Sequence, residues 1–185
     1  MSDSLITKRA LAKTLKEFCQ YRNFEKISIN DLTNKCGLNR QTFYYHFQDK
    51  YDLLQWLYYD ELFADIENII TFDNWDQCLL TVLEKIYQEK DFYISTINTN
   101  EQYYYHDLYN LAQKSFYDAI TKLDVNKTVS PQEKNFFSEF YAYGIAGTVL
   151  RWIKTNMKNE PAKLAHGLKK IATQSETFAA SLLNN

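Results

Sequence analysis

Two side chains near residue 40 have the chemistry to recognise individual DNA bases. Arg40 can donate two parallel hydrogen bonds to guanine, and Gln41 can pair in a similar way with adenine. Phe43 and Phe47 are four residues apart, so in a helix they would share one buried side. The side chains left to face outward are those of Arg40, Gln41, Tyr44 and Tyr45. This pattern predicts a helix in the major groove, with Arg40 and Gln41 as its base contacts.

Polar groups around this helix could bind the phosphates of the same duplex. Lys50 would lie on the first turn of the next helix, and Ser28 at a helix N-terminus, where free backbone N–H groups favour an anion. The predicted phosphate contacts are Ser28, Asn39, Thr42, Tyr44, Tyr45, His46 and Lys50. For Tyr44 and Tyr45 the alternative is a half-buried ring that only packs on the core.

The elements that must position these side chains form a helix-turn-helix, and its local signals are present. Ser28 and Asp31 are spaced like a capping box and predict a helix that ends at Gly37. Asn39 can then cap a second short helix over residues 40–47. Since any helical hairpin can show a helix, a glycine and another helix, this spacing alone is not specific.

Caps and apolar periodicity predict helices along the rest of the chain. Asp49 can cap a long linker helix, and the Ser130-Pro131-x-Glu133 segment is a strong start signal. A polar patch at residues 98–100 is expected to separate two helices. The other helices are expected over residues 5–22, from Lys50 to about Ile70, from Trp75 to the polar patch, from there to about Leu123, from Pro131 to about Met157, and from Pro161 to Leu183.

Composition restricts the class of protein. The chain has 185 residues with only 4 Gly and 2 Pro, which argues against turn-rich sandwiches and barrels and favours an all-α fold. A hydrophobic share of 45% excludes a disordered chain. No apolar run is long enough to span a membrane, and no export signal precedes the first helix, so we expect a cytoplasmic protein. Cys19, Cys36 and Cys78 lack metal-ligand spacing, so we expect reduced core thiols, no metal and no cofactor.

Charge is divided unevenly along the chain. Residues 1–50 carry nine Lys or Arg against five Asp or Glu, a net charge of +4, whereas the rest carries twelve against eighteen, a net charge of −6. A basic segment on an acidic body suggests an anion-binding module, although a solvated basic face explains the charge equally well.

One helix of the C-terminal part is apolar on nearly all sides. Between residues 136 and 153, small residues would let another helix come close, which predicts a subunit interface completed by the last helix. The alternative is a central helix inside a monomer. The predicted interface residues are Gly144, Gly147, Leu150, Leu168, Ile171 and Phe178.

Tyrosines are concentrated between residues 87 and 117. Their hydroxyls could line a pocket for a polar or aromatic effector, with His106 beside it. The predicted pocket residues are Tyr93, Tyr104, Tyr105 and Tyr109. Plain core packing is the alternative for most of these rings.

The whole segment from Ile27 to Leu54 resembles the signature of TetR-type transcriptional regulators, over about a sixth of the chain. The resemblance implies an all-helical two-fold dimer with an N-terminal operator-binding domain, a linker helix and a ligand-binding core. It places the family's phosphate-binding aromatic at Tyr44, its histidine at His46, its linker lysine at Lys50 and its base-reading pair at Arg40 and Gln41. Cys36 replaces the usual alanine before the glycine, which should alter packing only slightly.

A finer resemblance is to the branch that includes regulators of dihydroxyacetone kinase operons. It is carried by residues 39–54 together with Gly144, Gly147 and Trp152. Members of this branch can activate transcription with a partner protein.

Three classes of function can be compared on these grounds. No nucleophile–base arrangement, glycine-rich phosphate loop or metal motif supports an enzyme. A helical interaction module that has lost DNA binding is the second alternative. The presence of Arg40, Tyr44, His46 and Lys50 favours a DNA-binding regulator. We expect an operator-binding domain over residues 1–49 and a regulatory and dimerisation domain over residues 50–185. A small effector or a partner protein is expected to control DNA binding.

Overall fold

The computed structural model describes residues 3–71 and 73–183; for residues 3, 98–100, 103 and 175–183 it describes only the backbone. All regular structure in these residues is helical, which confirms the predicted all-α class. The elements are α1 (Asp3–Cys19), η1 (Phe24–Lys26), α2 (Ile29–Cys36), α3 (Arg40–His46), α4 (Lys50–Tyr58), η2 (Tyr59–Phe63), α5 (Trp75–Gln88), α6 (Lys90–Leu123), α7 (Pro131–Lys154) and α8 (Pro161–Leu183).

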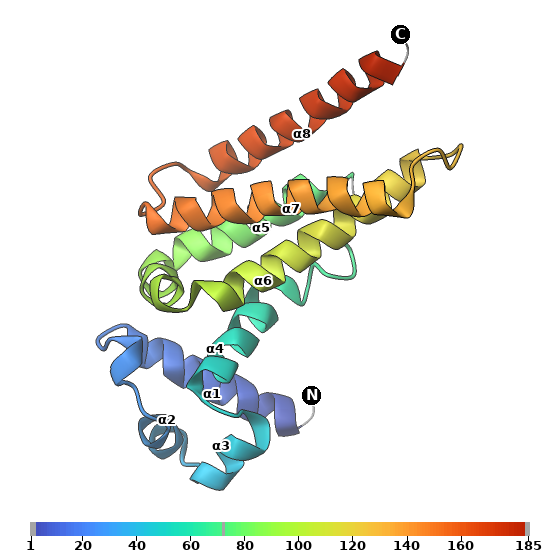
Figure 1. Ribbon diagram of the computed structural model, residues 1–185. Helices are drawn as coiled ribbons and strands as arrows, with labels where there is room; N and C mark the ends of the chain where they lie inside the picture. The colour runs from blue at the N-terminus through green and yellow to red at the C-terminus, as the bar shows by residue number, and fades with distance from the viewer. Residues whose placement is uncertain (1–2, 72, 184–185) are drawn as a thin grey trace.

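Helices α1 to α4 form one end of the molecule, which we call the head (Figure 1). Its core is built from the apolar faces of these helices, and Leu15, Leu32, Phe43 and Leu53 have no exposed surface. Burial of each such side chain contributes roughly 1.5–3 kcal/mol, which the short helices need because none would be stable alone.

The prediction of one continuous linker helix from Lys50 to about Ile70 is wrong for the second half of this segment. α4 ends at Tyr58 and continues as η2, one turn of π-helix in which the Ala64 N–H donates to the Tyr59 carbonyl, five residues back. Irregular turns follow to residue 69. The ammonium of Lys85 on α5 donates to the Glu61 carbonyl (2.8 Å), so a tertiary contact helps to hold this irregular register.

The predicted break at residues 98–100 is also wrong, because α6 runs through them without interruption. Ile97 and Tyr104, on either side of this segment, are fully buried. Packing of these side chains outweighs the weak helix propensity of the polar residues between them. The boundary lies instead at Glu89, between α5 and α6.

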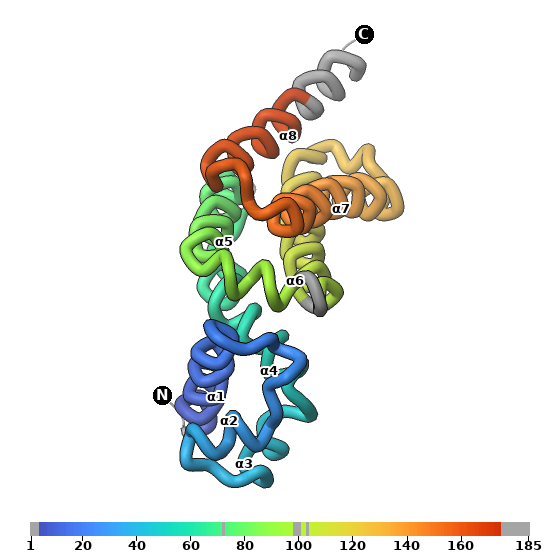
Figure 2. Tube along the Cα trace, turned by 90° about the vertical axis from the view of Figure 1, so that its left-hand side faces the viewer, coloured from blue at the N-terminus to red at the C-terminus, as the bar shows by residue number. Residues whose placement is uncertain are grey.

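Helices α5 to α8 form the other end, which we call the body (Figure 2). α7 packs along α6, and α8 packs against α5 before its C-terminal part leaves the body. α7 begins as predicted: Ser130 and Glu133 form a capping box, with Pro131 in the first turn. One continuous set of buried apolar side chains connects the head and the body. No helix in the described part is long and apolar enough to cross a membrane.

Candidate nucleic-acid interface

The turn between α2 and α3 fixes the outward-facing helix. The Ser28 hydroxyl accepts from the Asp31 N–H (3.1 Å), and the Asp31 carboxylate accepts from the Ser28 N–H (2.9 Å), as the capping-box spacing predicts. Gly37 then takes φ +66°, a left-handed conformation that side-chain-bearing residues rarely adopt. The Asn39 side-chain oxygen accepts from the Thr42 N–H (2.8 Å) and starts α3.

α3 has a buried side and an exposed side, as the aromatic spacing predicts. Phe43 is fully buried and Phe47 is 3% exposed, so both hold α3 on the head. Arg40 and Gln41 are exposed on the first turn. Tyr45 is 81% exposed and Tyr44 49%, so neither ring is simply part of the core. The Arg40 guanidinium donates to the Tyr44 hydroxyl (3.3 Å), which brings two predicted contact residues together.

Three other predicted contacts lie around this exposed side. The Thr42 hydroxyl donates to the Asn39 side-chain oxygen (3.0 Å), so these two residues form a local cap. The half-buried His46 ring packs edge-on against the Tyr45 ring, with centroids 4.9 Å apart. Asn39, Thr42 and His46 therefore all lie beside the exposed side of α3.

Ser28 and Asp31 bind each other at the start of α2, and the Asp31 carboxylate also pairs with Arg22 (3.5 Å). The Ser28 hydroxyl donates to the Asp31 carboxylate (2.7 Å), and these hydrogen bonds lower the pKa of Asp31 below its ordinary value. Arg22 offsets the charge of this carboxylate, but the Ser28 hydroxyl and N–H both already donate to Asp31 and are not free for a phosphate. This geometry opposes the predicted phosphate contact of Ser28, which stays a prediction.

Lys50 makes internal contacts that the sequence did not suggest. Its ammonium donates to the backbone carbonyls of Phe24 (3.0 Å), Glu25 (2.9 Å) and Ile27 (3.2 Å). It also lies over the Phe24 ring, 4.8 Å from the centroid, and its side chain is only 14% exposed. All three N–H donors of the ammonium therefore have partners in the η1 turn.

Cys36 connects the end of α2 to α1. Its sulfur lies 3.1 Å from the Thr14 hydroxyl on α1 and donates to the Ala10 carbonyl (3.6 Å). A thiol at this position can therefore form weak polar contacts that an alanine could not.

Comparisons with known proteins cover both ends of the chain. Residues 11–57 match the model of the TetR family of bacterial regulatory proteins, and residues 73–174 match a model of a transcriptional regulator C-terminal region. The curated "HTH-type dhaKLM operon transcriptional activator DhaS" of Lactococcus lactis subsp. lactis (strain IL1403) is 30% identical over 148 residues, which cover 78% of each chain. The chain belongs to the TetR family of transcriptional regulators. The resemblance to TetR-type regulators, and to the branch with dihydroxyacetone kinase operon regulators, is thus confirmed.

A solved structure supports the same fold for this TetR-family chain. "Dihydroxyacetone kinase operon activator DhaS" superimposes with a TM-score of 0.69 at 24% identity, covering 92% of this chain and 96% of that one. The likeness therefore extends over the head and the body and is not limited to the helix-turn-helix.

The four tyrosines of the predicted effector pocket fall into two sets in the body of this TetR-family regulator. Tyr93 and Tyr104 are 1% and 0% exposed, and burial raises the pKa of both phenols. Both rings pack on Tyr58, with centroids 5.9 and 6.0 Å away. Tyr93 and Tyr104 are therefore packed in the core, which was the alternative to a pocket.

The other two tyrosines are half-buried on α6, near α7. The Tyr105 and Tyr109 rings are stacked at 6.3 Å, and Tyr109 packs on Tyr143 of α7 at 4.7 Å. Nearby His106 is solvent-exposed and hydrogen-bonded to Asn110. The structure thus does not gather the four predicted tyrosines around one site.

An apolar cavity of the body lies elsewhere, between η2, α5 and α6. It measures about 30 Å³ and is lined by apolar side chains, among them Phe63, Trp75, Leu79 and Phe116. Such a volume has room for a water molecule or two, not for a metabolite.

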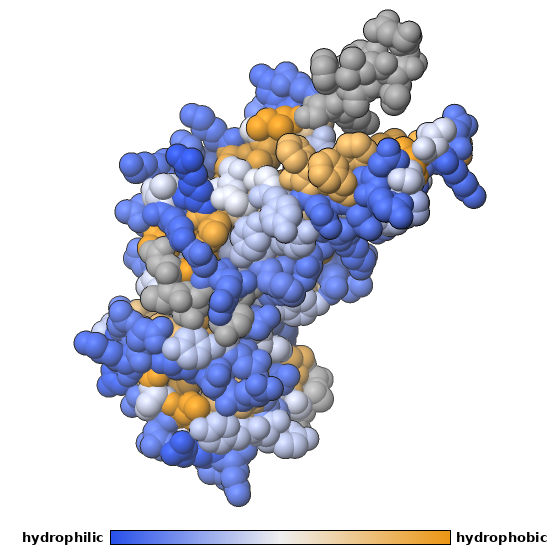
Figure 3. All heavy atoms as spheres, viewed as in Figure 1, coloured by the Kyte–Doolittle hydropathy of each residue, from blue (hydrophilic) through white to orange (hydrophobic). Residues whose placement is uncertain are grey.

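The predicted interface residues lie on α7 and α8. Gly144 is exposed, whereas Gly147, Leu150 and Leu168 are half-buried, and Ile171 is 62% exposed. Phe178 lies outside the residues whose side chains are described. The exposed side of α7 also carries aromatic rings that were not predicted from the sequence, Phe136 (67% exposed), Phe140 (68%) and Tyr143 (56%). Figure 3 shows apolar side chains gathered over this part of the body.

Within the described residues, no group of three or more His, Cys, Asp or Glu side chains could hold a metal ion.

A set of ion pairs between the head and the body was not predicted from the sequence. It joins Lys16 to Glu61 and Glu89, and Arg9 to Asp60. These positions are far apart along the chain, so spacing could not have found them.

Proposed function

We propose that this TetR-family regulator binds operator DNA with the exposed side of α3. The observation that carries the proposal is the division of α3: Phe43 and Phe47 are buried on the head while Arg40 and Gln41 are exposed on its first turn. An arginine and a glutamine at the start of a helix of this size can reach base edges in the major groove. We infer that Arg40 and Gln41 contact bases.

The phosphate contacts follow from the same geometry. Five polar or aromatic residues with hydrogen-bond donors lie on or beside the exposed side of α3. They are Asn39, Thr42, Tyr44, Tyr45 and His46. Ser28 and Lys50, whose donors have partners inside the head, are better explained as residues that hold the head in shape.

We further propose that the functional unit is a two-fold dimer formed through α7 and α8. The exposed aromatic rings of α7 support this, because a contiguous apolar surface of this kind is unfavourable in water until a partner covers it. In a two-fold dimer, each chain would cover this surface of its partner with the same surface of its own. Two α3 helices would then face one side of the dimer and read a near-palindromic operator.

The signal that controls binding is proposed to be a partner protein. The apolar cavity of about 30 Å³ in the body has no room for a metabolite. The larger hollows, of about 180 to 1000 Å³, are lined mainly by charged and polar side chains, unlike a typical metabolite pocket, which supports a partner protein over a small effector. By analogy with the relative named as a dhaKLM operon activator, we propose activation of dihydroxyacetone kinase genes. This is a regulatory role in the cytoplasm, where the DNA is, and not an enzymatic one.

Titration of the purified protein with DNA fragments from its own gene neighbourhood, at several salt concentrations, tests the proposal. We expect tight binding to one fragment and weak binding to the others, with affinities that fall as salt rises. Equal binding to all fragments would contradict sequence-specific recognition, and no binding at all would favour a protein-interaction module.

A further inference from the structure

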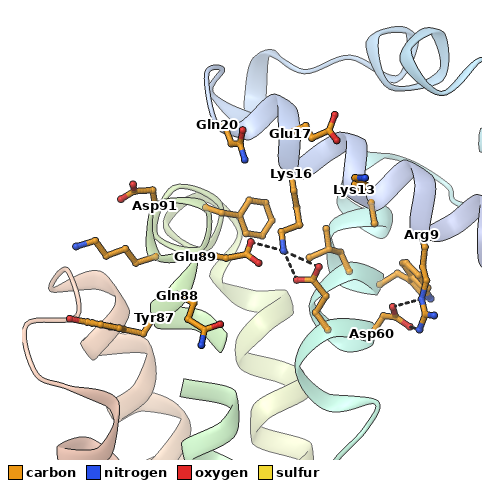
Figure 4. A pocket seen from close by; sticks show the side chains of 16 residues that line it. Arg9, Lys13, Lys16, Glu17, Gln20, Asp60, Tyr87, Gln88, Glu89 and Asp91 are labelled. Carbon is orange, nitrogen blue, oxygen red and sulfur yellow. Dashed lines mark hydrogen bonds and ion pairs between the residues drawn. The ribbon is translucent and has the colours of Figure 1, made fainter. Parts of the chain in front are cut away.

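A cleft of about 1000 Å³ separates the head from the body on one side of the molecule (Figure 4). Its walls come from α1, from the end of α4 with η2, and from the corner between α5 and α6. α4 and η2 are the covalent connection across this boundary. The orientation of the head on the body is therefore held by the shared apolar core and by side chains that bridge the cleft.

Lys16 of α1 is the central bridge. Its ammonium lies 2.8 Å from the Glu61 carboxylate in η2 and 2.6 Å from the Glu89 carboxylate at the α5–α6 corner. It also lies 5.3 Å from the centroid of the Phe92 ring, and its side chain is 17% exposed. One cation thus binds the head to two separate parts of the chain.

Glu61 is bound from the body side as well. Its carboxylate accepts from the Tyr93 hydroxyl of α6 (3.0 Å), and its backbone carbonyl accepts from the Lys85 ammonium of α5 (2.8 Å). The residue lies inside the π-helical turn, a type of irregularity that is frequent at functional sites. Movement of α5 or α6 would therefore act directly on the partner of Lys16.

We propose that Lys16, Glu61 and Glu89 are positioning residues that fix the orientation of the head and thereby set the distance between the two operator half-sites. The proposal rests on the dimeric operator binding proposed above. In a dimer whose bodies are held together, the angle of each head determines the separation of the two α3 helices. Glu61 and Glu89 are 36% and 48% exposed, so their ion pairs can break and re-form more readily than a packed core can rearrange.

Selection of binding sites from random DNA duplexes measures this spacing and requires no known operator sequence. The selection is run in parallel with the wild type, Lys16→Met, Glu89→Gln and a control, Lys13→Met. Lys13 lines the same cleft and is exposed, so its substitution removes an equal charge without removing the central bridge. Thermal unfolding of each variant identifies any general loss of stability.

We expect the wild type and Lys13→Met to select paired half-sites at one separation. Lys16→Met should select the same half-site sequence at several separations, because the head still folds and reads DNA but loses both ion pairs of this bridge. Glu89→Gln should broaden the separations less, because one of the two pairs remains. A merely structural role would weaken binding without changing the distribution of separations. If Lys16→Met does not fold, Glu89→Gln decides the matter, since it leaves the Lys16–Glu61 pair in place.

Two results would overturn the inference in distinguishable ways. If both cleft variants select the single separation found for the wild type, the head is oriented by other contacts and only the positioning role is lost. If the wild type itself selects no paired half-sites, the dimeric operator binding on which the inference rests is wrong as well.

Discussion

The Lys50 ammonium lies 2.9 Å from the backbone carbonyl oxygen of Glu25 and 3.9 Å from the Glu25 carboxylate, with which it forms an ion pair. This contact attaches the start of α4 to the η1 turn that precedes α2. The Tyr51 hydroxyl, which donates to the Glu25 carboxylate (2.8 Å), strengthens the same attachment. The family resemblance places a phosphate contact at Lys50, whereas the geometry favours a role in shaping the head.

Replacement of Lys50 by Met should therefore act mainly on stability. Loss of a charged donor to three carbonyls is expected to lower the free energy of unfolding by roughly 1–3 kcal/mol. Operator binding should weaken, but the dependence of log affinity on log salt should keep its slope, because no phosphate contact is removed. Chemical denaturation and salt titrations measure the two quantities.

Lys26→Met is the matched control for this prediction, because Lys26 is exposed in the same turn. It should change stability little. A salt slope for Lys50→Met that is shallower by about one unit than that of the wild type would instead support the phosphate contact predicted from the sequence.

Asp124 gives the α6–α7 connection a dependence on pH. Its carboxylate accepts from the Lys134 ammonium (2.9 Å) and from the backbone N–H groups of Thr128 (2.7 Å) and Val129 (3.2 Å). The hydrogen bond from Lys134 first, and those from the loop, lower the pKa of Asp124 from 3.8 to about 2. Because the folded pKa lies below the unfolded one, the stabilisation is complete above the unfolded pKa and is lost as pH falls through the folded pKa.

Asp124→Asn should consequently destabilise the protein at neutral pH and much less in acid. The difference in free energy of unfolding from the wild type is expected to be constant down to a pH of about 4 and to shrink below it. Denaturation curves of both proteins across this range provide the measurement. A difference that does not depend on pH would show that the Asp124 charge contributes nothing to the folded state.

Gly147 offers a test of the dimer that leaves the single chain intact. A Cβ atom built on Gly147 meets nothing within 4 Å, so a side chain can start there without a clash inside one chain. Gly147→Leu should even stabilise the isolated helix slightly, since glycine is a poor helix former. In a dimer with closely packed α7 helices, the same side chain would force the two backbones apart.

Sedimentation analysis should accordingly show a dimeric wild type and a weakened or monomeric Gly147→Leu variant with unchanged helicity. Lys122→Leu, at the exposed end of α6, adds the same side chain outside the proposed interface and should remain dimeric. A monomeric wild type at micromolar concentration would contradict the proposed dimer.

Signals within a few residues of each other were sufficient to predict much of the head and the start of α7. Ser28 with Asp31, Gly37 and Asn39 act through hydrogen bonds and backbone conformations that the local sequence determines, and the structure contains each of them. Asp49 likewise caps α4, as its position suggested. The exposed side of α3 followed from the spacing of its buried aromatic rings.

Features that depend on distant contacts were not predictable in the same way. The π-helical turn at Tyr59–Phe63 contains no proline or glycine, and the Lys85 contact on Glu61 comes from another helix. Similarly, periodicity placed Tyr93 and Tyr105 on helices but could not show that Tyr93 would be fully buried against Tyr58 while Tyr105 is half-buried and stacks on Tyr109.

The central claim is that α3 reads sequence through Arg40. Its most direct test is titration of wild type, Arg40→Ala and Arg40→Lys against a selected operator and a scrambled duplex of equal length. We expect Arg40→Ala to lose roughly 1–3 kcal/mol of binding free energy on the operator and much less on scrambled DNA. Arg40→Lys should keep the charge but lose most of the preference, because an ammonium cannot form the two parallel hydrogen bonds of a guanidinium. Equal losses on both duplexes would contradict base recognition by Arg40 and reduce it to a backbone contact.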